Sequence, residues 1–181
     1  MSEELAVLKL VSERLRSAGI PYMITGSIAS NFYAVPRMTR DVDLVIEMKR
    51  SDVDRLMGLF KDDFYIDRDS VMQAVDQQGM FNILHNESVI KIDFIVRKDT
   101  PYRELEFGRR REISVEGVRM WIVSPEDLVL SKLVWASDSM SEMQLGDVKN
   151  ILAMARGIDY GYLEKWVSSL SLQETYRKVQ S

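Results

Sequence analysis

The stretch YMITGSIASNFYAVPRMTRDVDLVIE, residues 22–47, decides the expected fold of this 181-residue chain. Its apolar start indicates a strand that runs into Gly26-Ser27 and a short helix, and its end, DVDLVIE, indicates a second strand. Side chains on a strand alternate between its two faces, so Asp41 and Asp43 are expected on the same face. Two adjacent carboxylates beside a helix that opens with glycine suit phosphoryl chemistry with divalent metals.

The two carboxylates of this D-x-D motif repel each other. At roughly 5–6 Å and an effective dielectric constant of about 20, two unit charges repel by about 3 kcal/mol, so the pair takes up either a proton or a cation. Mg²⁺ prefers oxygen ligands and is usually held by one or two carboxylates together with substrate phosphates. An isolated D-x-D on a surface strand is more often metal-free, so the interpretation needs a third ligand.

A third carboxylate, Asp93, lies in the apolar stretch VIKIDFIV at residues 89–96. Isoleucine, phenylalanine and valine alternate on one face of this expected strand, and Asp93 falls on the other face together with Lys91. An unpaired acid is costly to bury there. Taken alone, Asp93 is interpreted as an edge-strand residue paired with Lys91. Taken with the D-x-D motif and Gly26-Ser27, it completes a set of three metal ligands.

In this pattern the chain resembles the nucleotidyltransferase superfamily, whose members have the DNA polymerase β-like fold. The resemblance depends on Gly26-Ser27, on the D-x-D motif and on Asp93. The segment SPEDLVLSKLVWA…LGDVKNILA, within residues 124–153, extends it toward small stand-alone prokaryotic members. Those members include minimal nucleotidyltransferases, AbiE-type toxin enzymes and antibiotic-modifying relatives.

The order of the expected helices and strands agrees with an α+β class. Apolar residues at helical spacing predict a first helix over residues 3–18, closed by Gly19. The other expected elements are strand 21–25, helix 27–33, strand 41–47, a helix from Ser51, strand 64–67, a short helix 69–77, a hairpin of strands 80–85 and 89–96, two short strands within 112–123, and helices 125–136, 143–155 and 160–169 before a polar tail. We expect a mixed β-sheet nucleotidyltransferase core with helices on one side over residues 1–123, followed by a C-terminal helical region over residues 124–181 that packs on the core.

The resemblance implies two-metal nucleotidyl transfer, in which an NMP moves from an NTP to a hydroxyl acceptor and pyrophosphate leaves. Asp41, Asp43 and Asp93 are then the catalytic residues and the ligands of two Mg²⁺ ions, for which Mn²⁺ can substitute. Asp93 is also expected to accept the proton of the acceptor hydroxyl.

Five further residues are candidates for nucleotide binding. Gly26 permits close approach of the backbone, and Ser27 caps the following helix, whose amino-terminal amides suit a triphosphate. Arg37 and Arg40 offer guanidinium groups for phosphate contacts, and a solvated surface loop is the other interpretation. Lys132 is a nucleotide-phosphate candidate through the resemblance, and a solvated lysine otherwise.

Composition and charge argue against several other classes of function. The chain has no cysteine and one histidine, His85, so disulfide frameworks and zinc sites are not expected. Its net charge of −4 argues against binding of extended duplex nucleic acid. Arg103 and Arg109-Arg110-Arg111 form a local basic cluster, interpreted as a solvated turn or a contact for a polyanionic acceptor. The start MSEE is unlike a secretory signal and no apolar run is long enough for a membrane span, so a cytoplasmic protein is expected.

Two functional classes stay open. The first is an active enzyme that adds AMP or another NMP to a small molecule, a protein or a tRNA end. Its setting is a toxin–antitoxin pair, with an antitoxin as partner, or antibiotic modification. The second is a catalytically inactive nucleotide- and metal-binding module that acts as a sensor or partner subunit. Retention of all three carboxylates with Gly26-Ser27 favours the active enzyme.

Overall fold

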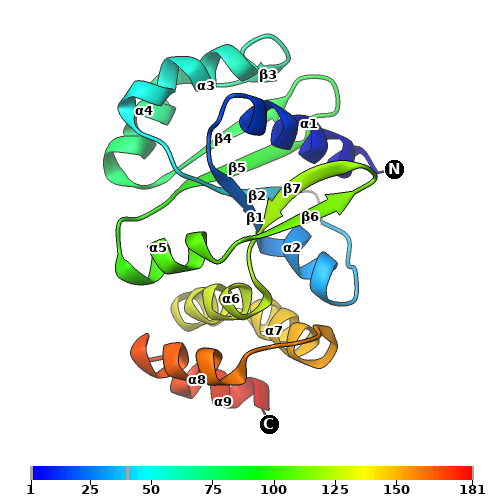
Figure 1. Ribbon diagram of the computed structural model, residues 1–181, viewed down its shortest axis with the longest axis vertical. Coiled ribbons are helices and arrows are strands. Elements are labelled where there is room, and N and C mark those ends of the chain that lie inside the picture. The colour runs from blue at the N-terminus through cyan, green and yellow to red at the C-terminus, as the bar shows by residue number, and fades with distance from the viewer. Residues whose placement is uncertain (1, 40, 181) are drawn as a thin grey trace. The chain divides into compact units, whose positions relative to one another are not determined.

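Seven strands form one mixed sheet in the part of the chain that the computed structural model describes, residues 2–39 and 41–180 (Figure 1). They are β1 (Tyr22–Thr25), β2 (Asp41–Ile46), β3 (Phe64–Tyr65), β4 (Met80–His85), β5 (Lys91–Val96), β6 (Arg111–Val115) and β7 (Val118–Ile122). Their spatial order is β3-β4-β5-β2-β1-β7-β6. The β2–β5 and β1–β7 pairs are parallel and the other pairs are antiparallel. The expected α+β class with a mixed sheet is confirmed.

The chain divides into two compact units. The first comprises residues 1–28 and 38–122, and the second comprises residues 29–37 and 123–181. The first unit holds the sheet with α1 (Glu3–Ser17), η1 (Arg50–Asp52, a short 3-10 helix), α3 (Val53–Phe60), α4 (Arg68–Gln77) and α5 (Pro101–Gly108). The second holds α6 (Pro125–Ser139), α7 (Glu142–Met154), α8 (Tyr160–Ser169) and α9 (Gln173–Gln180), and the chain passes between the two units within α2 (Gly26–Tyr33).

The central strands β2 and β5 each have one apolar face. Val42, Leu44 and Ile46 are buried, and so are Ile92 and Phe94 in β5. The ring of Phe94 stacks on Phe81 of β4, and its centroid lies 6.2 Å from that of Phe60 in α3. Burial of such a side chain stabilises the fold by about 1.5–3 kcal/mol. Because a slip of one residue would turn the acidic face into this core, the apolar pattern also determines the register of both strands.

In the second unit, α6 carries most of the core. Leu128, Val129, Leu130 and Leu133 are buried, and α6 packs against α7, α8 and α9. Ser124 precedes this helix, and its hydroxyl accepts a hydrogen bond from the backbone N–H of Asp127 at 3.2 Å. A side-chain cap of this kind satisfies an amide that has no partner within the helix, so the start of α6 is well determined.

Two helices were not predicted from the sequence. One is α5, which begins with Pro101 after the capping residue Thr100 and therefore has a start signal that the prediction overlooked. The other is α9, which occupies the expected polar tail. Only Tyr176 and Val179 of α9 are buried, so its apolar pattern is too sparse to indicate a helix. The helix expected from Ser51 begins later, because Ser51 lies in η1 and α3 starts at Val53.

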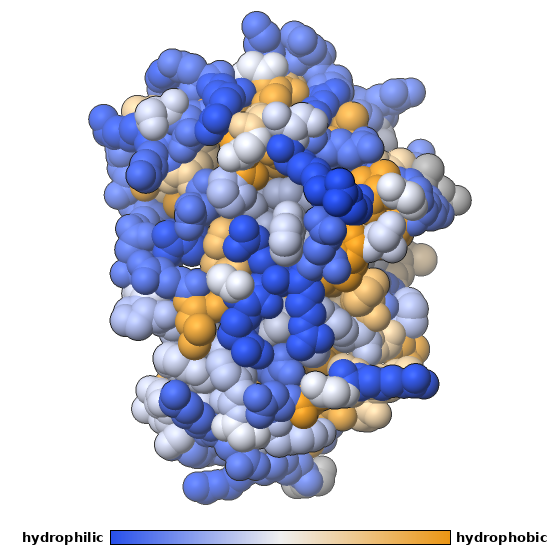
Figure 2. Space-filling model, in the orientation of Figure 1, coloured by the Kyte–Doolittle hydropathy of each residue, from blue (hydrophilic) through white to orange (hydrophobic). Residues whose placement is uncertain are grey.

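The surface is mainly polar on the face that Figure 2 shows, with separate hydrophobic areas between hydrophilic ones. Such scattered apolar surface is ordinary for a folded domain. Among the residues that the structure describes, no helix combines the length and the apolar character that a membrane crossing needs.

Candidate functional site

Asp43 and Asp93 are direct neighbours across the sheet. β2 and β5 run parallel, and their register pairs Asp43 with Asp93 and Asp41 with Lys91. Residues paired in this way lie on the same face of strands that are about 4.8 Å apart. The structure thus brings the two acids together from separate stretches of sequence. The interpretation of Asp93 as an edge-strand residue is wrong, because β5 lies between β4 and β2, but its expected pairing with Lys91 is confirmed at 2.8 Å.

The same row of paired residues extends over two more strands. Thr25 of β1 pairs with Asp43, and Asn82 of β4 pairs with Asp93. Thr25 is buried and Asn82 is exposed, so the row places a hydroxyl group and an amide on either side of the two carboxylates. Sequence reasoning missed both residues. The signal for Asn82 was its place between the apolar residues Phe81 and Ile83, which puts it on the acidic face.

Gly26 makes room for the Asp43 carboxylate. Its φ is +63°, in the left-handed region that favours glycine. A Cβ atom built on Gly26 would lie 2.1 Å from Oδ2 of Asp43 and 2.7 Å from its Cγ, so no larger side chain fits while Asp43 keeps this position. Ser27 follows directly. Because α2 begins at Gly26, Ser27 lies inside the first turn of the helix, and the prediction that it caps this helix is wrong.

The ammonium group of Lys91 lies among the acids. Its Nζ is 2.8 Å from Oδ2 of Asp93 and 3.9 Å from Oδ1 of Asp41. The hydrogen bond to Asp93 raises the pKa of Lys91. Burial lowers this pKa by a smaller amount, and the charges of Asp93, Asp41 and Asp43 add further small increases. The Asp93 side chain is only 14% exposed, whereas that of Asp41 is 62% exposed. Asp41 is thus the outermost of the three carboxylates.

These residues fit a hard divalent cation by their chemistry. All three acidic side chains offer oxygen ligands, which Mg²⁺ prefers, and a positive group already lies between two of them. Within residues 2–39 and 41–180, however, no three acidic or histidine side chains are arranged as a closed metal site. Asp43 and Asp93 are adjacent in register, whereas Asp41 pairs with Lys91 and is the most exposed of the three acids.

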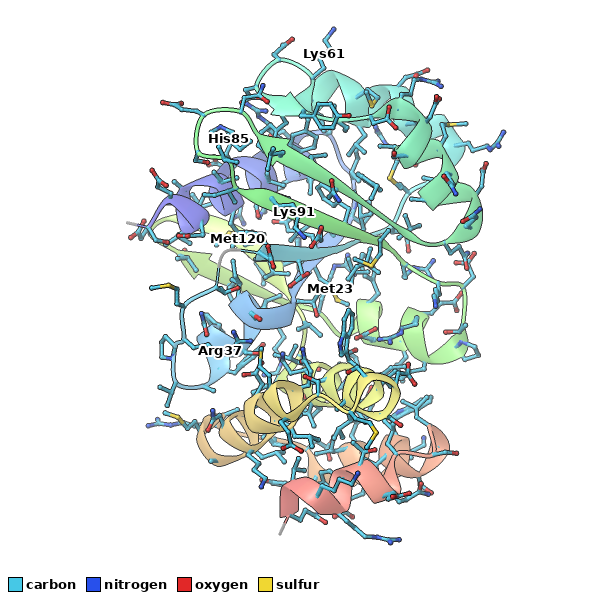
Figure 3. All side chains as sticks on the ribbon, turned by 180° about the vertical axis from the view of Figure 1, so that it is seen from behind. Met23, Arg37, Lys61, His85, Lys91 and Met120 are labelled. Atoms are coloured by element: carbon cyan, nitrogen blue, oxygen red, sulfur yellow. The ribbon has the colours of Figure 1, made fainter. Side chains whose placement is uncertain are left out.

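Two of the predicted nucleotide-binding residues meet on a buried carboxylate in the second unit. The guanidinium of Arg37, in the loop after α2 (Figure 3), donates from Nε and Nη2 to the two carboxylate oxygens of Asp147, each at 3.1 Å. Nζ of Lys132 donates to Oδ2 of Asp147 at 2.8 Å and to Gln144 at 2.9 Å. Burial raises the pKa of Asp147, but the hydrogen bonds from the two cations outweigh it and hold the pKa below its usual value.

The alternative interpretation of Lys132 as a solvated lysine is wrong, because its side chain is only 5% exposed. Asn31 adds to this cluster by accepting a hydrogen bond from the backbone N–H of Arg37 at 2.9 Å and donating one to its carbonyl oxygen at 2.7 Å. A role of Arg37 and Lys132 in nucleotide binding stays a prediction. Arg40 lies outside the described residues.

The basic cluster near α5 is only partly solvated. The guanidinium of Arg110 lies 4.3 Å from the ring centroid of Phe107 and 5.0 Å from that of Trp121. Burial lowers the pKa of Arg110. Arg103 is held by Glu106 of the same helix at 2.7 Å. The interpretation of this cluster as a solvated turn is wrong for Arg110, which packs between two aromatic rings.

Comparison with known proteins gives a family and a fold. The family model described as "Nucleotidyl transferase of unknown function (DUF2204)" matches residues 4–170. An antigenic nucleotidyltransferase-like protein from Paracoccidioides brasiliensis is 22% identical with a TM-score of 0.60, covering 84% of this chain and 76% of the other. No curated protein sequence matches the chain.

Two further solved structures share the fold. A putative nucleotidyltransferase from Thermotoga maritima is 16% identical with a TM-score of 0.54, covering 78% of this chain and 89% of the other. The lincosamide antibiotic adenylyltransferase LnuA, solved with lincomycin bound, is 13% identical with a TM-score of 0.54, covering 83% of this chain and 96% of the other. At such low identities these structures establish the fold of the chain and leave its substrates open.

Proposed function

This chain belongs to the family of nucleotidyl transferases of unknown function (DUF2204), and on that premise we propose that it moves a nucleoside monophosphate from a nucleoside triphosphate to a hydroxyl acceptor, with release of pyrophosphate. The observation that carries the proposal is the register pairing of Asp43 with Asp93 on parallel neighbouring strands. Two acids are thereby held side by side next to a glycine that no larger residue can replace without moving Asp43.

The metal part of the proposal assigns Asp41, Asp43 and Asp93 to two Mg²⁺ ions, with Mn²⁺ as a substitute. If these residues hold the ions, the metal would supply charge neutralisation to the phosphoryl group during an in-line displacement. The all-oxygen donor set and the cation already held by Asp93 support this assignment. Because the Asp41 side chain is mostly exposed, it is the ligand that has the freedom to close the site.

The protein residues have separate roles in the proposed reaction. Asp93 takes the proton of the acceptor hydroxyl, whose oxygen then forms a bond to the α-phosphorus. The bond from that phosphorus to the oxygen that bridges to the β-phosphate breaks, and pyrophosphate leaves with the electron pair. Backbone amides at Gly26 and Ser27, at the start of α2, bind the phosphates. Arg37, Arg40 and Lys132 remain candidates for further phosphate contacts.

The acceptor is proposed only by class: a small-molecule hydroxyl, a protein side chain or a tRNA end. The lincosamide adenylyltransferase of similar fold supports the small-molecule class. A toxin–antitoxin setting with an antitoxin partner and a cytoplasmic location both stay predictions. Absence of a basic excess, with a net charge of −4, supports an acceptor other than extended duplex nucleic acid.

The alternative is a catalytically inactive module that binds nucleotide and metal and acts as a sensor or partner subunit. Binding of a nucleotide with no transfer of label to any acceptor class would support this alternative.

The test uses ATP, CTP, GTP and UTP, each labelled on the α-phosphate, with Mg²⁺ and one acceptor from each class. Wild type is compared with Asp43→Asn and with the matched control Asp99→Asn, which removes a surface aspartate of the same unit that pairs with Arg97. We expect transfer of label by wild type and by the control and none by Asp43→Asn. Transfer by a folded Asp43→Asn variant at the wild-type rate would contradict the proposal.

A further inference from the structure

Lys91 holds a position that a metal ion would also need. It lies on β5 two residues before Asp93, so its side chain emerges on the same face of the sheet (Figure 3). Its ammonium is 2.8 Å from Asp93 and 3.9 Å from Asp41, and the charge of Asp43 acts on it as well. One positive group therefore lies within 4 Å of two of the three carboxylates that the proposed function assigns to metal binding.

We propose that Lys91 is a built-in competitor of the divalent cation: it neutralises the acids while the site is empty and must withdraw when a metal binds. This inference rests on the metal part of the proposed function. It differs from a purely structural ion pair because it makes Lys91 and the metal mutually exclusive at Asp93. It also makes Lys91 a residue that determines how tightly the chain binds metal.

Competition between the two cations follows from their charges at Asp93. Mg²⁺ needs ligand oxygens at about 2.0–2.1 Å in a nearly octahedral arrangement. Oδ2 of Asp93 already accepts a hydrogen bond from the Lys91 ammonium at 2.8 Å. An ammonium and a divalent ion on the same carboxylate would repel each other strongly, because the Asp93 side chain is only 14% exposed and water screens little there.

Of the two partners, Lys91 is the one that moves. Asp93 is fixed in the middle of the sheet between β2 and β4. Lys91 has a flexible stem of four carbons, and its side chain is 43% exposed, so the ammonium has a path into solvent. A metal ion can bind Asp93 only after the hydrogen bond between Lys91 and Asp93 breaks. The free energy needed to break this hydrogen bond lowers the metal affinity of the wild-type protein.

The experiment measures Mn²⁺ binding to nucleotide-free protein by the electron paramagnetic resonance signal of free Mn²⁺. Lys91→Met removes the charge and keeps most of the stem, whereas Lys91→Arg keeps the charge. The matched control is Lys9→Met, because Lys9 forms an ion pair with Glu116 at a similar distance, 3.0 Å, in the same unit. If Lys91→Met does not fold, Lys91→Gln takes its place.

We expect Lys91→Met to bind Mn²⁺ about tenfold more tightly than wild type, a factor that corresponds to about 1.4 kcal/mol. Lys91→Arg and Lys9→Met should bind with affinities close to that of wild type. In EDTA the melting temperature of Lys91→Met should fall, since the adjacent carboxylates of Asp43 and Asp93 then lose their nearby positive charge, and Mn²⁺ should restore it. Equal Mn²⁺ affinity in wild type and Lys91→Met overturns the inference, and so does equal tightening in Lys9→Met.

The result separates this inference from the proposed function. Tighter Mn²⁺ binding by Lys91→Met without transfer of label by wild type supports the inference and contradicts the enzyme. Transfer of label with unchanged Mn²⁺ affinity in Lys91→Met overturns the inference alone. Absence of Mn²⁺ binding in every variant overturns the inference together with the metal part of the proposed function.

Discussion

Replacing Gly26 with alanine should displace the Asp43 carboxylate and leave most of the first unit intact. The added Cβ would lie 2.1 Å from Oδ2 of Asp43, whereas ordinary van der Waals contact begins at 3.4 Å, so the carboxylate must move by about 1.3 Å. The backbone adds a separate cost, because the φ of Gly26 is +63° and an L-residue in that region loses about 1–2 kcal/mol.

The expected effect on activity is larger than the effect on stability. Ligand distances in a metal site hold to about 0.2 Å, and a misplacement of about 1 Å at a reacting centre costs about 10²-fold in rate. Gly26→Ala should therefore lower kcat/KM for transfer of label from an α-labelled NTP by about 100-fold or more. Its free energy of unfolding, measured by chemical denaturation, should fall by at least the backbone cost of about 1–2 kcal/mol, and the clash with Asp43 adds to this loss.

Gly19→Ala is the matched control. Gly19 has nearly the same φ, +65°, but a Cβ built on it meets nothing within 4 Å. Gly19→Ala should lose only the backbone cost in stability, Gly26→Ala should lose that cost and more, and only Gly26→Ala should lose activity. The reasoning is refuted if Gly26→Ala transfers label at the wild-type rate, or if the two variants lose activity equally.

Three further predictions concern stability in chemical denaturation. Asp147→Asn should lower the free energy of unfolding by about 3 kcal/mol, because Arg37 and Lys132 then lose a buried counter-charge. A decrease no larger than that expected for a surface ion pair would contradict this prediction. Asp63→Asn should cost less than about 1 kcal/mol, because this partner of Arg14 is partly exposed. The hydrogen bond from Arg14 lowers the pKa of Asp63, so the stabilisation is complete above the unfolded pKa of about 3.9 and disappears as pH falls through the lower folded pKa. Wild type and Asp63→Asn should then unfold alike in strong acid, and a difference that persists there would refute the assignment. Val89→Asn should raise stability by about 1 kcal/mol, since a β-branched residue at a φ of +58° is strained and asparagine tolerates this region; the exposed Val35→Asn, outside that region, should show no gain.

Much of the fold was predictable from local patterns. The helix expected over residues 160–169 is α8, with the same bounds, and Gly19 ends α1 with a positive φ as expected. Alternation along β2 correctly placed Val42, Leu44 and Ile46 in the core and the two acids of the D-x-D motif on the other face. Such patterns can be recognised in a sequence because side chains return to the same face every two residues in a strand and about every 3.6 residues in a helix.

The pairing of strands was not predictable in the same way. Nothing near Asp43 in the sequence specifies that Asp93, rather than another residue of β5, lies directly beside it. The contribution of Thr25 and Asn82 to that row depends on the same register. The partner of Lys132 was also hidden, because Asp147 lies on the next helix and the spacing within α6 indicates only which face Lys132 occupies.

The most direct test of the central claim, that Asp43 and Asp93 together support transfer of an NMP, compares ATP labelled on the α-phosphate with ATP labelled on the γ-phosphate. Wild type should place the α-label on the acceptor and release the γ-label as pyrophosphate, and Asp93→Asn, still folded, should do neither. Appearance of the γ-label on the acceptor, or undiminished α-label transfer by Asp93→Asn, would contradict the claim.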